Sequence, residues 1–170
     1  MHGKRIITAR LTLDVIRECD FNSLISIFKS EAVSRTYMVP DMNTAEDEEK
    51  LFNVLLSLSA RQDRYVYGIF LDDSLIGIIN DTEINGDRIE VGYALDHNYF
   101  SMGYMTEALF GLIGHLFKLG FEEVVCGAFD HNVASIRVME KCGMTLLDKT
   151  DEIEYRGKLH KCIYHSIKRT

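Results

Sequence analysis

The order of hydrophobic patterns between residues 65 and 128 constrains the fold of this 170-residue chain more than any other feature. Three short segments with strand character follow one another, at 65–71, 75–79 and 89–95. They are joined by polar turns, and the second turn, Asn85-Gly86, is a strong hairpin signal. The middle of the chain is therefore predicted to be an antiparallel meander.

The pattern then changes from strand to helix. Apolar residues recur at helical spacing between Met105 and Phe117, and Gly120 is the expected C-cap. A short strand is predicted at 122–128. Because a helix separates it from the strand that ends at Leu95, the two strands should run parallel. A second helix is expected next, from about residue 134 to residue 142.

The two ends of the chain complete a single domain over residues 1–170. A first strand is predicted at 11–16, and Asp20 is expected to cap the helix that follows. Thr44 and the acids after it predict another helix start. Two final strands, near 145–154 and 159–167, should turn at Arg156-Gly157. We expect a mixed α/β domain, with a central mixed sheet flanked by helices.

Composition excludes several classes of function. The net charge of −7 and the pI near 5.3 argue against a nucleic-acid partner. No apolar run approaches the roughly 20 residues of a membrane helix, and the opening residues do not resemble a signal peptide, so we expect a cytoplasmic protein. The cysteines, Cys19, Cys126, Cys142 and Cys162, are far apart, with no C-x-x-C motif and no histidine at metal-ligand spacing. We expect reduced, mostly buried thiols and no metal site.

The segment from Tyr99 to Ala108 lies between a predicted strand and a predicted helix. A helix N-terminus offers unpaired N–H groups and a partial positive charge, which suit a pyrophosphate. Gly103 would let the backbone approach such a group closely. The alternative is that Gly103 only makes a tight turn.

Asn132 and Ser135 lie at the start of the second helix. Both residue types favour helix caps, so plain capping is one interpretation. The two helices follow neighbouring parallel strands, however, and their N-termini should open at the same edge of the sheet, where ligands bind in α/β folds. The other interpretation is therefore one continuous ligand site.

The chain resembles the Gcn5-related N-acetyltransferases (GNAT), in particular the RimJ and RimL branch. The resemblance rests on five segments: Arg10-Leu-Thr-Leu, Ile89-Glu-Val-Gly-Tyr-Ala-Leu95, Gly103-Tyr-Met-Thr-Glu-Ala108, the spaced residues Asn132, Ser135, Val138, Lys141 and Gly143, and the last hairpin Tyr155-Arg-Gly-Lys158. It implies a GNAT-like fold with parallel strands splayed at the cofactor site, and acetyl-CoA as cosubstrate. It also implies a primary amine acceptor, either a protein N-terminus or a small amine, and is compatible with a homodimer. The cofactor-binding residues that it implies are Tyr93, Ala94, Leu95, Met102, Gly103, Tyr104, Met105, Thr106, Asn132 and Ser135.

The chain departs from the family pattern at four positions. Phe100, Met102 and Met105 are bulky and apolar where the family's pyrophosphate loop usually has polar or small residues. Met139 stands where much of the wider family has a tyrosine that acts as general acid. Backbone N–H groups make most phosphate contacts in this family, so we expect binding of CoA to survive.

Direct attack of an amine on a thioester requires a base, an oxyanion donor and help for the leaving thiolate. Glu90 is the candidate base, and its alternative role is a solvent-facing strand carboxylate. A backbone N–H near Ala94 or Leu95 would stabilise the oxyanion. Ser135 is the candidate substitute for the missing tyrosine, and Cys126 and Cys142 are interpreted as core residues.

Two competing functions stay open. The departures at Phe100, Met102, Met105 and Met139 would also suit a sensor that binds CoA or a nucleotide without turnover. The second alternative is a nucleotide enzyme of another kind, such as a kinase-like domain. This sequence lacks the glycine-lysine signature of a phosphate-binding loop, which argues against it.

Overall fold

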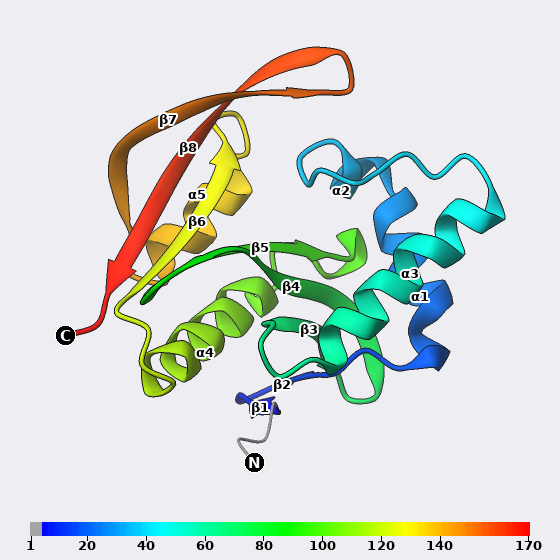
Figure 1. Ribbon diagram of the computed structural model, residues 1–170, viewed down its shortest axis with the longest axis horizontal. Coiled ribbons are helices and arrows are strands. Elements are labelled where there is room, and N and C mark those ends of the chain that lie inside the picture. Colours follow the sequence, from blue (N-terminus) through cyan, green and yellow to red (C-terminus); the bar gives the residue numbers. More distant parts are fainter. Residues whose placement is uncertain (1–4) are drawn as a thin grey trace.

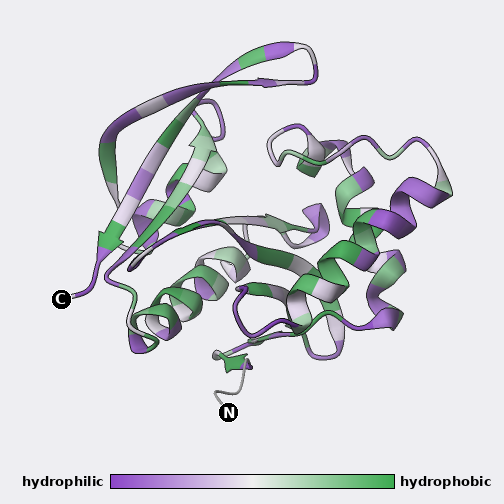
Figure 2. Cartoon of the chain, in the orientation of Figure 1, coloured by the Kyte–Doolittle hydropathy of each residue, from purple (hydrophilic) through white to green (hydrophobic). Residues whose placement is uncertain are grey.

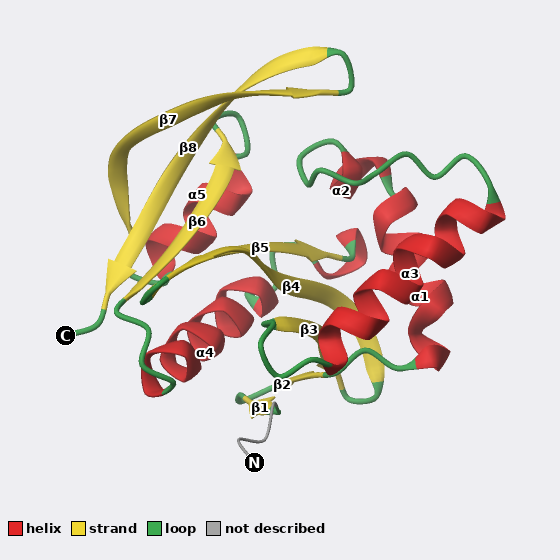
Figure 3. Cartoon of the chain, viewed as in Figure 1, coloured by secondary structure: helices red, strands yellow, loops and turns green. Residues whose placement is uncertain are grey.

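The computed structural model describes residues 5–170. Residues 1–4, part of the opening segment that we judged unlike a signal peptide, lie outside the described residues. The described part of the chain forms an eight-stranded sheet in the order β1-β2-β3-β4-β5-β6-β8-β7 (Figures 1 and 3). Its strands are β1 (Ile6–Ile7), β2 (Leu11–Asp14), β3 (Val66–Leu71), β4 (Ser74–Asn85), β5 (Arg88–Leu95), β6 (Glu123–Phe129), β7 (Thr145–Tyr155) and β8 (Lys158–Lys168).

Within residues 5–170, five α-helices accompany the sheet: α1 (Phe21–Lys29), α2 (Glu31–Ser34), α3 (Ala45–Ala60), α4 (Tyr104–Lys118) and α5 (Val133–Lys141). β3, β4 and β5 pair antiparallel, whereas β5 and β6 pair parallel, with α4 between them in the chain. The predicted meander, crossover and mixed sheet are therefore confirmed. Gly86, in the turn between the paired residues Asn85 and Arg88, has a φ of 62°, which a glycine adopts without strain.

The sheet buries a separate apolar cluster on each face. On one face, Leu109 and Leu112 of α4 pack with Ile89 and Val91 of β5. On the other face, α1 and α3 pack against the sheet in a second cluster, which includes Phe28 and Phe52. Figure 2 shows α4 as a largely hydrophobic helix, which agrees with the many buried residues on it. Burial on both faces holds the central strands rigidly, so they can position a site.

The sequence predicts caps at two helix starts, those of α3 and α1. Thr44 caps α3 as predicted, because its side chain accepts from the Asp47 N–H and the Asp47 carboxylate accepts from the Thr44 N–H. Asp20 stands at the N-cap position of α1, as predicted, but without a side-chain cap bond. Its carboxylate accepts from the backbone N–H and guanidinium of Arg17, so it makes no cap bond to α1. The short elements β1 and α2 were not predicted, since neither is long enough to show a periodic pattern.

The β7–β8 hairpin turns at Arg156 and Gly157, as predicted, and reaches across the molecule to the segment after α2 (Figure 1). The Tyr155 hydroxyl donates to the Ser34 carbonyl over 2.5 Å and accepts from the Val39 N–H over 3.3 Å. These bonds hold the end of the hairpin against the 34–39 segment.

Candidate active site

The parallel strands β5 and β6 are paired along only part of their length. Pairing runs from Arg88 with Glu123 to Val91 with Cys126 and then stops. Beyond this point β5 continues to Leu95 paired with β4 alone, and β6 continues to Phe129 paired with β8 alone. The two facing edges therefore diverge and leave backbone N–H and C=O groups without a strand partner. This confirms the expectation of splayed parallel strands.

A glycine occupies the first position beyond the last pair on each strand, Gly92 on β5 and Gly127 on β6. A side chain at Gly127 would be crowded, because a Cβ there would lie 2.8 Å from the Tyr164 ring. Both glycines line the cleft that opens between the strands. Neither glycine stands out in the sequence, because their equivalent positions on two parallel strands become apparent only with the strand register.

The cleft has a volume of about 730 Å³ and continues from the strand divergence to the starts of α4 and α5. It is lined by all but one of the predicted site residues: Glu90, Tyr93, Ala94, Leu95, Gly103, Tyr104, Met105, Thr106, Asn132 and Ser135. Met102 does not line it, and its side chain is half exposed. The tertiary structure thus brings two segments about 30 residues apart into one hollow of suitable size for a ligand.

The loop before α4 is shaped by residues from the start of the chain. Gly103 adopts a left-handed conformation with a φ of 80° and is the N-cap of α4. The Arg10 guanidinium donates to the Met102 carbonyl over 3.0 Å and lies 4.4 Å from the centre of the Tyr104 ring. Both Arg10 and Thr8 are held by Glu107, so this carboxylate is structural.

The first N–H groups of α4 point out of the helix start, where they have no partner within the helix. The positive end of the helix dipole adds to them. Burial would raise the pKa of Glu107, yet hydrogen bonds from Thr8 and Arg10 outweigh it and hold the pKa below its usual value. Glu107 is therefore charged and keeps Arg10 in place beside the loop. A guanidinium beside these N–H groups suits the binding of an anion.

The start of α5 combines a cap with a second polar contact. The Asn132 side-chain oxygen accepts from the Ser135 N–H over 3.2 Å, so Asn132 is a helix cap. The Ser135 hydroxyl lies 2.8 Å from the Tyr93 hydroxyl of β5. The Asn132 oxygen is therefore used for the helix cap, while the Ser135 hydroxyl contacts the Tyr93 hydroxyl across the cleft.

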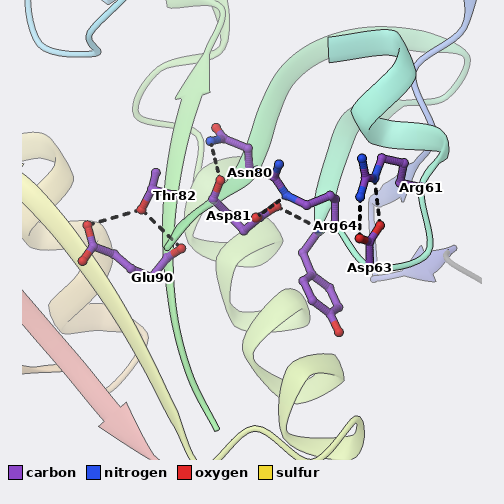
Figure 4. A network of polar contacts seen from close by, with 8 residues as sticks. Arg61, Asp63, Arg64, Asn80, Asp81, Thr82 and Glu90 are labelled. Atoms are coloured by element: carbon purple, nitrogen blue, oxygen red, sulfur yellow. Dashed lines mark hydrogen bonds and ion pairs between the residues drawn. The ribbon is translucent and has the colours of Figure 1, made fainter. Parts of the chain in front are cut away.

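Glu90 projects to the opposite face of β5 from Ile89 and Val91, which are buried as expected. It is half-buried and lies beside Thr82, whose hydroxyl is 3.3 Å from both the Glu90 carboxylate and its carbonyl (Figure 4). Thr82 is the extra residue where the β4–β5 register shifts, so a bulge turns it toward Glu90. Burial raises the pKa of Glu90, although Thr82 and the charges of Lys149 and Arg88 oppose the rise.

Beyond Glu90, the cleft is lined by polar side chains that the sequence did not reveal. The Tyr37 hydroxyl donates to the Asn80 side chain over 2.7 Å, and Tyr164 donates to Asp151 over 2.8 Å. Tyr37, Asn80 and Tyr164 all line the cleft. They come from the loop after α2, from β4 and from β8, so no local pattern could have connected them.

The residues that depart from the family pattern have different surroundings. Met139 and Met105 are buried in the core cluster beneath α4 and α5, whereas Phe100 is exposed at the rim of the cleft. Cys126 and Cys142 are buried, and burial raises the pKa of Cys142 to about 11. Such thiols are poor nucleophiles, in agreement with their interpretation as core residues.

Two absences concern the part of the chain that the structure describes. Among residues 5–170, no three His, Cys, Asp or Glu side chains are grouped so that they could hold a metal ion. Over the same range, no helix combines the length and apolar character needed to cross a bilayer.

Known proteins resemble this chain in sequence and in structure. The model of the acetyltransferase (GNAT) domain family matches residues 10–145. The Probable N-acetyltransferase YjcK of Bacillus subtilis (strain 168) is 30% identical over 109 residues, which span 61% of this chain and 60% of that protein.

Two solved structures show the same fold. RimL, described as a ribosomal L7/L12 alpha-N-protein acetyltransferase in complex with coenzyme A, matches with a TM-score of 0.85 at 23% identity, over 96% of this chain and 97% of RimL. A GNAT-family acetyltransferase from Bacillus anthracis matches with a TM-score of 0.83 at 22% identity, over 96% of this chain and 98% of its own.

Proposed function

Because the chain belongs to the GNAT family of acetyltransferases, we propose that it is an N-acetyltransferase that passes the acetyl group of acetyl-CoA directly to a primary amine. The observation that carries this proposal is the divergence of β5 and β6 after Val91 and Cys126, beneath the starts of α4 and α5. An elongated thioester suits a cleft with free backbone groups along one wall and a helix N-terminus at one end.

The proposed binding mode assigns each part of acetyl-CoA to one element. The pyrophosphate lies at the start of α4, against the backbone N–H groups from Gly103 to Thr106. The pantetheine follows the free edge of β5 near Ala94 and Leu95, and the Asn132 amide lies on the other wall. Met102 takes part through its backbone, because Arg10 holds its carbonyl on the loop.

The proposed chemistry assigns two side chains. An alkyl amine with a pKa near ~10 must lose a proton before it attacks, and Glu90 accepts this proton, directly or through a water. Its partial burial and its place on the strand beside the thioester support this role. A backbone N–H near Ala94 or Leu95 stabilises the oxyanion, and Ser135 donates a hydrogen bond to the leaving sulfur.

For the acceptor we propose the α-amino group of a peptide or protein. The likeness to RimL supports a protein N-terminus, as does a polar acceptor end lined by Tyr37, Asn80 and Thr82, whose oxygens suit an extended backbone. An α-amino group has a pKa near ~8, so it needs less help from a base than an alkyl amine does.

The test is release of free thiol from acetyl-CoA in the presence of matched acceptors. One peptide is supplied with a free N-terminus, with an acetylated N-terminus, and with a lysine as its single free amine, beside a panel of small amines. We expect turnover with the free N-terminus and mass addition on its α-nitrogen. Turnover only with small amines would contradict the choice of acceptor. Tight binding of acetyl-CoA without turnover of any amine would instead indicate a sensor.

A further inference from the structure

Two hydroxyl groups meet where β5 faces the first turn of α5. The Tyr93 hydroxyl lies 2.8 Å from Ser135 Oγ and 3.2 Å from the Ser135 carbonyl oxygen. Tyr93 packs against the core cluster beneath α4 and α5, which fixes its ring, and both residues line the cleft. Its single hydrogen can be donated fully to only one of these two oxygens, so the pair has two possible arrangements.

The two arrangements differ in what they offer to a ligand. If Tyr93 donates to the Ser135 carbonyl, the Ser135 hydroxyl donates its own hydrogen back to the Tyr93 oxygen. If Tyr93 donates to Ser135 Oγ, the hydrogen of Ser135 is released and can point into the cleft. Only the second arrangement presents a hydrogen-bond donor to an atom bound there.

From this geometry we infer that Tyr93 is a positioning residue, which donates to Ser135 Oγ and so turns the Ser135 O–H toward the sulfur of CoA. The inference rests on the proposed function, because that sulfur reaches Ser135 only if the cleft takes acetyl-CoA. When the carbon–sulfur bond breaks, its electron pair stays on sulfur, which accepts the hydrogen bond from Ser135. No proton leaves Ser135 or Tyr93, and the thiolate takes its proton from solvent.

The surroundings of Tyr93 suit a donor that never ionises. Burial raises the pKa of Tyr93 well above its usual value and Cys126 acts in the same direction, which together outweigh the lowering of the pKa by the hydrogen bond with Ser135. The hydroxyl therefore keeps its hydrogen at the alkaline pH where an acceptor amine is neutral. This also explains why a serine, a very weak acid, suffices at this position: it donates a hydrogen bond and no proton.

A binding experiment tests the inference without any acceptor. The affinities for CoA and for desulfo-CoA, which lacks the sulfur, are measured by calorimetry from about pH 7 to pH 10, a range that spans a thiol pKa near ~8.5. We expect the preference of the wild type for CoA to rise about tenfold with pH, as thiolate forms. Tyr93→Phe and Ser135→Ala should each remove most of this rise. Tyr65→Phe, which removes a hydroxyl from the same core cluster outside the cleft, should keep it.

A double-mutant cycle distinguishes positioning from general structural support. In single-turnover acetyl transfer, Tyr93→Phe should slow the wild type roughly tenfold and the Ser135→Ala variant less than twofold, with the same loss of thermal stability in both. Ser135→Thr keeps a hydroxyl and should restore the dependence on Tyr93. Equal slowing in both backgrounds, or an unchanged preference for CoA in Tyr93→Phe, would overturn the inference. Failure of the wild type to bind CoA would instead overturn the proposed function.

Discussion

The Glu107 carboxylate accepts hydrogen bonds from both the backbone N–H and the guanidinium of Arg10, each over 2.7 Å. Arg10 in turn donates to the Met102 carbonyl, so a residue of the first turn of α4 holds the loop in front of that helix through the start of the chain. The loop is thus anchored to the sheet, and its backbone N–H groups keep one orientation.

Replacement of Glu107 by alanine should weaken acetyl-CoA binding about tenfold, because Arg10 would leave the loop. It should also lower the free energy of unfolding by about 1–2 kcal/mol, the usual range for hydrogen bonds to a charged group, reduced by partial exposure. Calorimetry with acetyl-CoA and denaturant unfolding measure the two effects. Glu122→Ala is the matched control, since it breaks the exposed pair with Arg169 far from the cleft. Equal affinities of the two variants would contradict the anchoring role.

The contribution of Glu107 to stability should depend on pH. Its pKa is lowered in the folded protein, so its charged form contributes stability at pH values above the unfolded pKa of about 4.3. This contribution is lost as the pH falls through the folded pKa. The difference in unfolding free energy between wild type and Glu107→Ala should therefore be constant near neutral pH and shrink in acid. A difference that grows in acid would contradict the sign.

Gly103→Asp should abolish acetyl-CoA binding, because a side chain strains a residue with φ of 80° and a carboxylate would repel the pyrophosphate. Gly120→Asp is the control for backbone strain, since Gly120 has a φ of 102° at the other end of α4. We expect both variants to lose stability and only the first to lose binding. Retained affinity in Gly103→Asp would remove this loop from the site.

Asn132→Ala should cost about 1 kcal/mol of stability through the lost cap. Thr44→Ala removes the corresponding cap of α3, outside the cleft, and should cost about as much. If Asn132 also contacts the cofactor, its variant alone should show a higher KM for acetyl-CoA. If both variants lose the same stability and keep a normal KM for acetyl-CoA, Asn132 acts only as a helix cap.

Glu90→Gln keeps the shape of the side chain and removes its basicity, so kcat should fall by about 10²-fold near neutral pH. In the wild type, burial raises the pKa of Glu90, and the acid limb of the kcat/KM profile should therefore lie above the ordinary carboxylate value. The limb should be absent from Glu90→Gln, whose rate should recover partly at high pH, where the amine is neutral unaided. Glu46→Gln, on the exposed first turn of α3 outside the cleft, is the control. A normal rate in Glu90→Gln would leave bulk water as the proton acceptor.

Local sequence determined the elements whose stabilising interactions lie within a few residues. The Thr44–Asp47 capping box, the Asn85-Gly86 turn and the helical spacing of α4 were predicted correctly, because each depends on neighbours in the chain. The alternation of β5 likewise placed Glu90 on the opposite face of the strand from Ile89 and Val91. Asp20 stands at the predicted N-cap position of α1, but its carboxylate binds the guanidinium of Arg17, three residues before it, and makes no cap bond.

Tertiary structure decided how these elements combine into a site. Arg10 and Glu107 are 97 positions apart, Tyr93 and Ser135 are 42 apart, and Ser34 and Tyr155 are 121 apart. No periodic pattern encodes such pairs, because they form only when strand register and helix packing are complete. The divergence of β5 and β6 is of the same kind. Each strand reads as continuous in the sequence, and the gap between them arises because each is held on its far side by a different partner, β4 or β8.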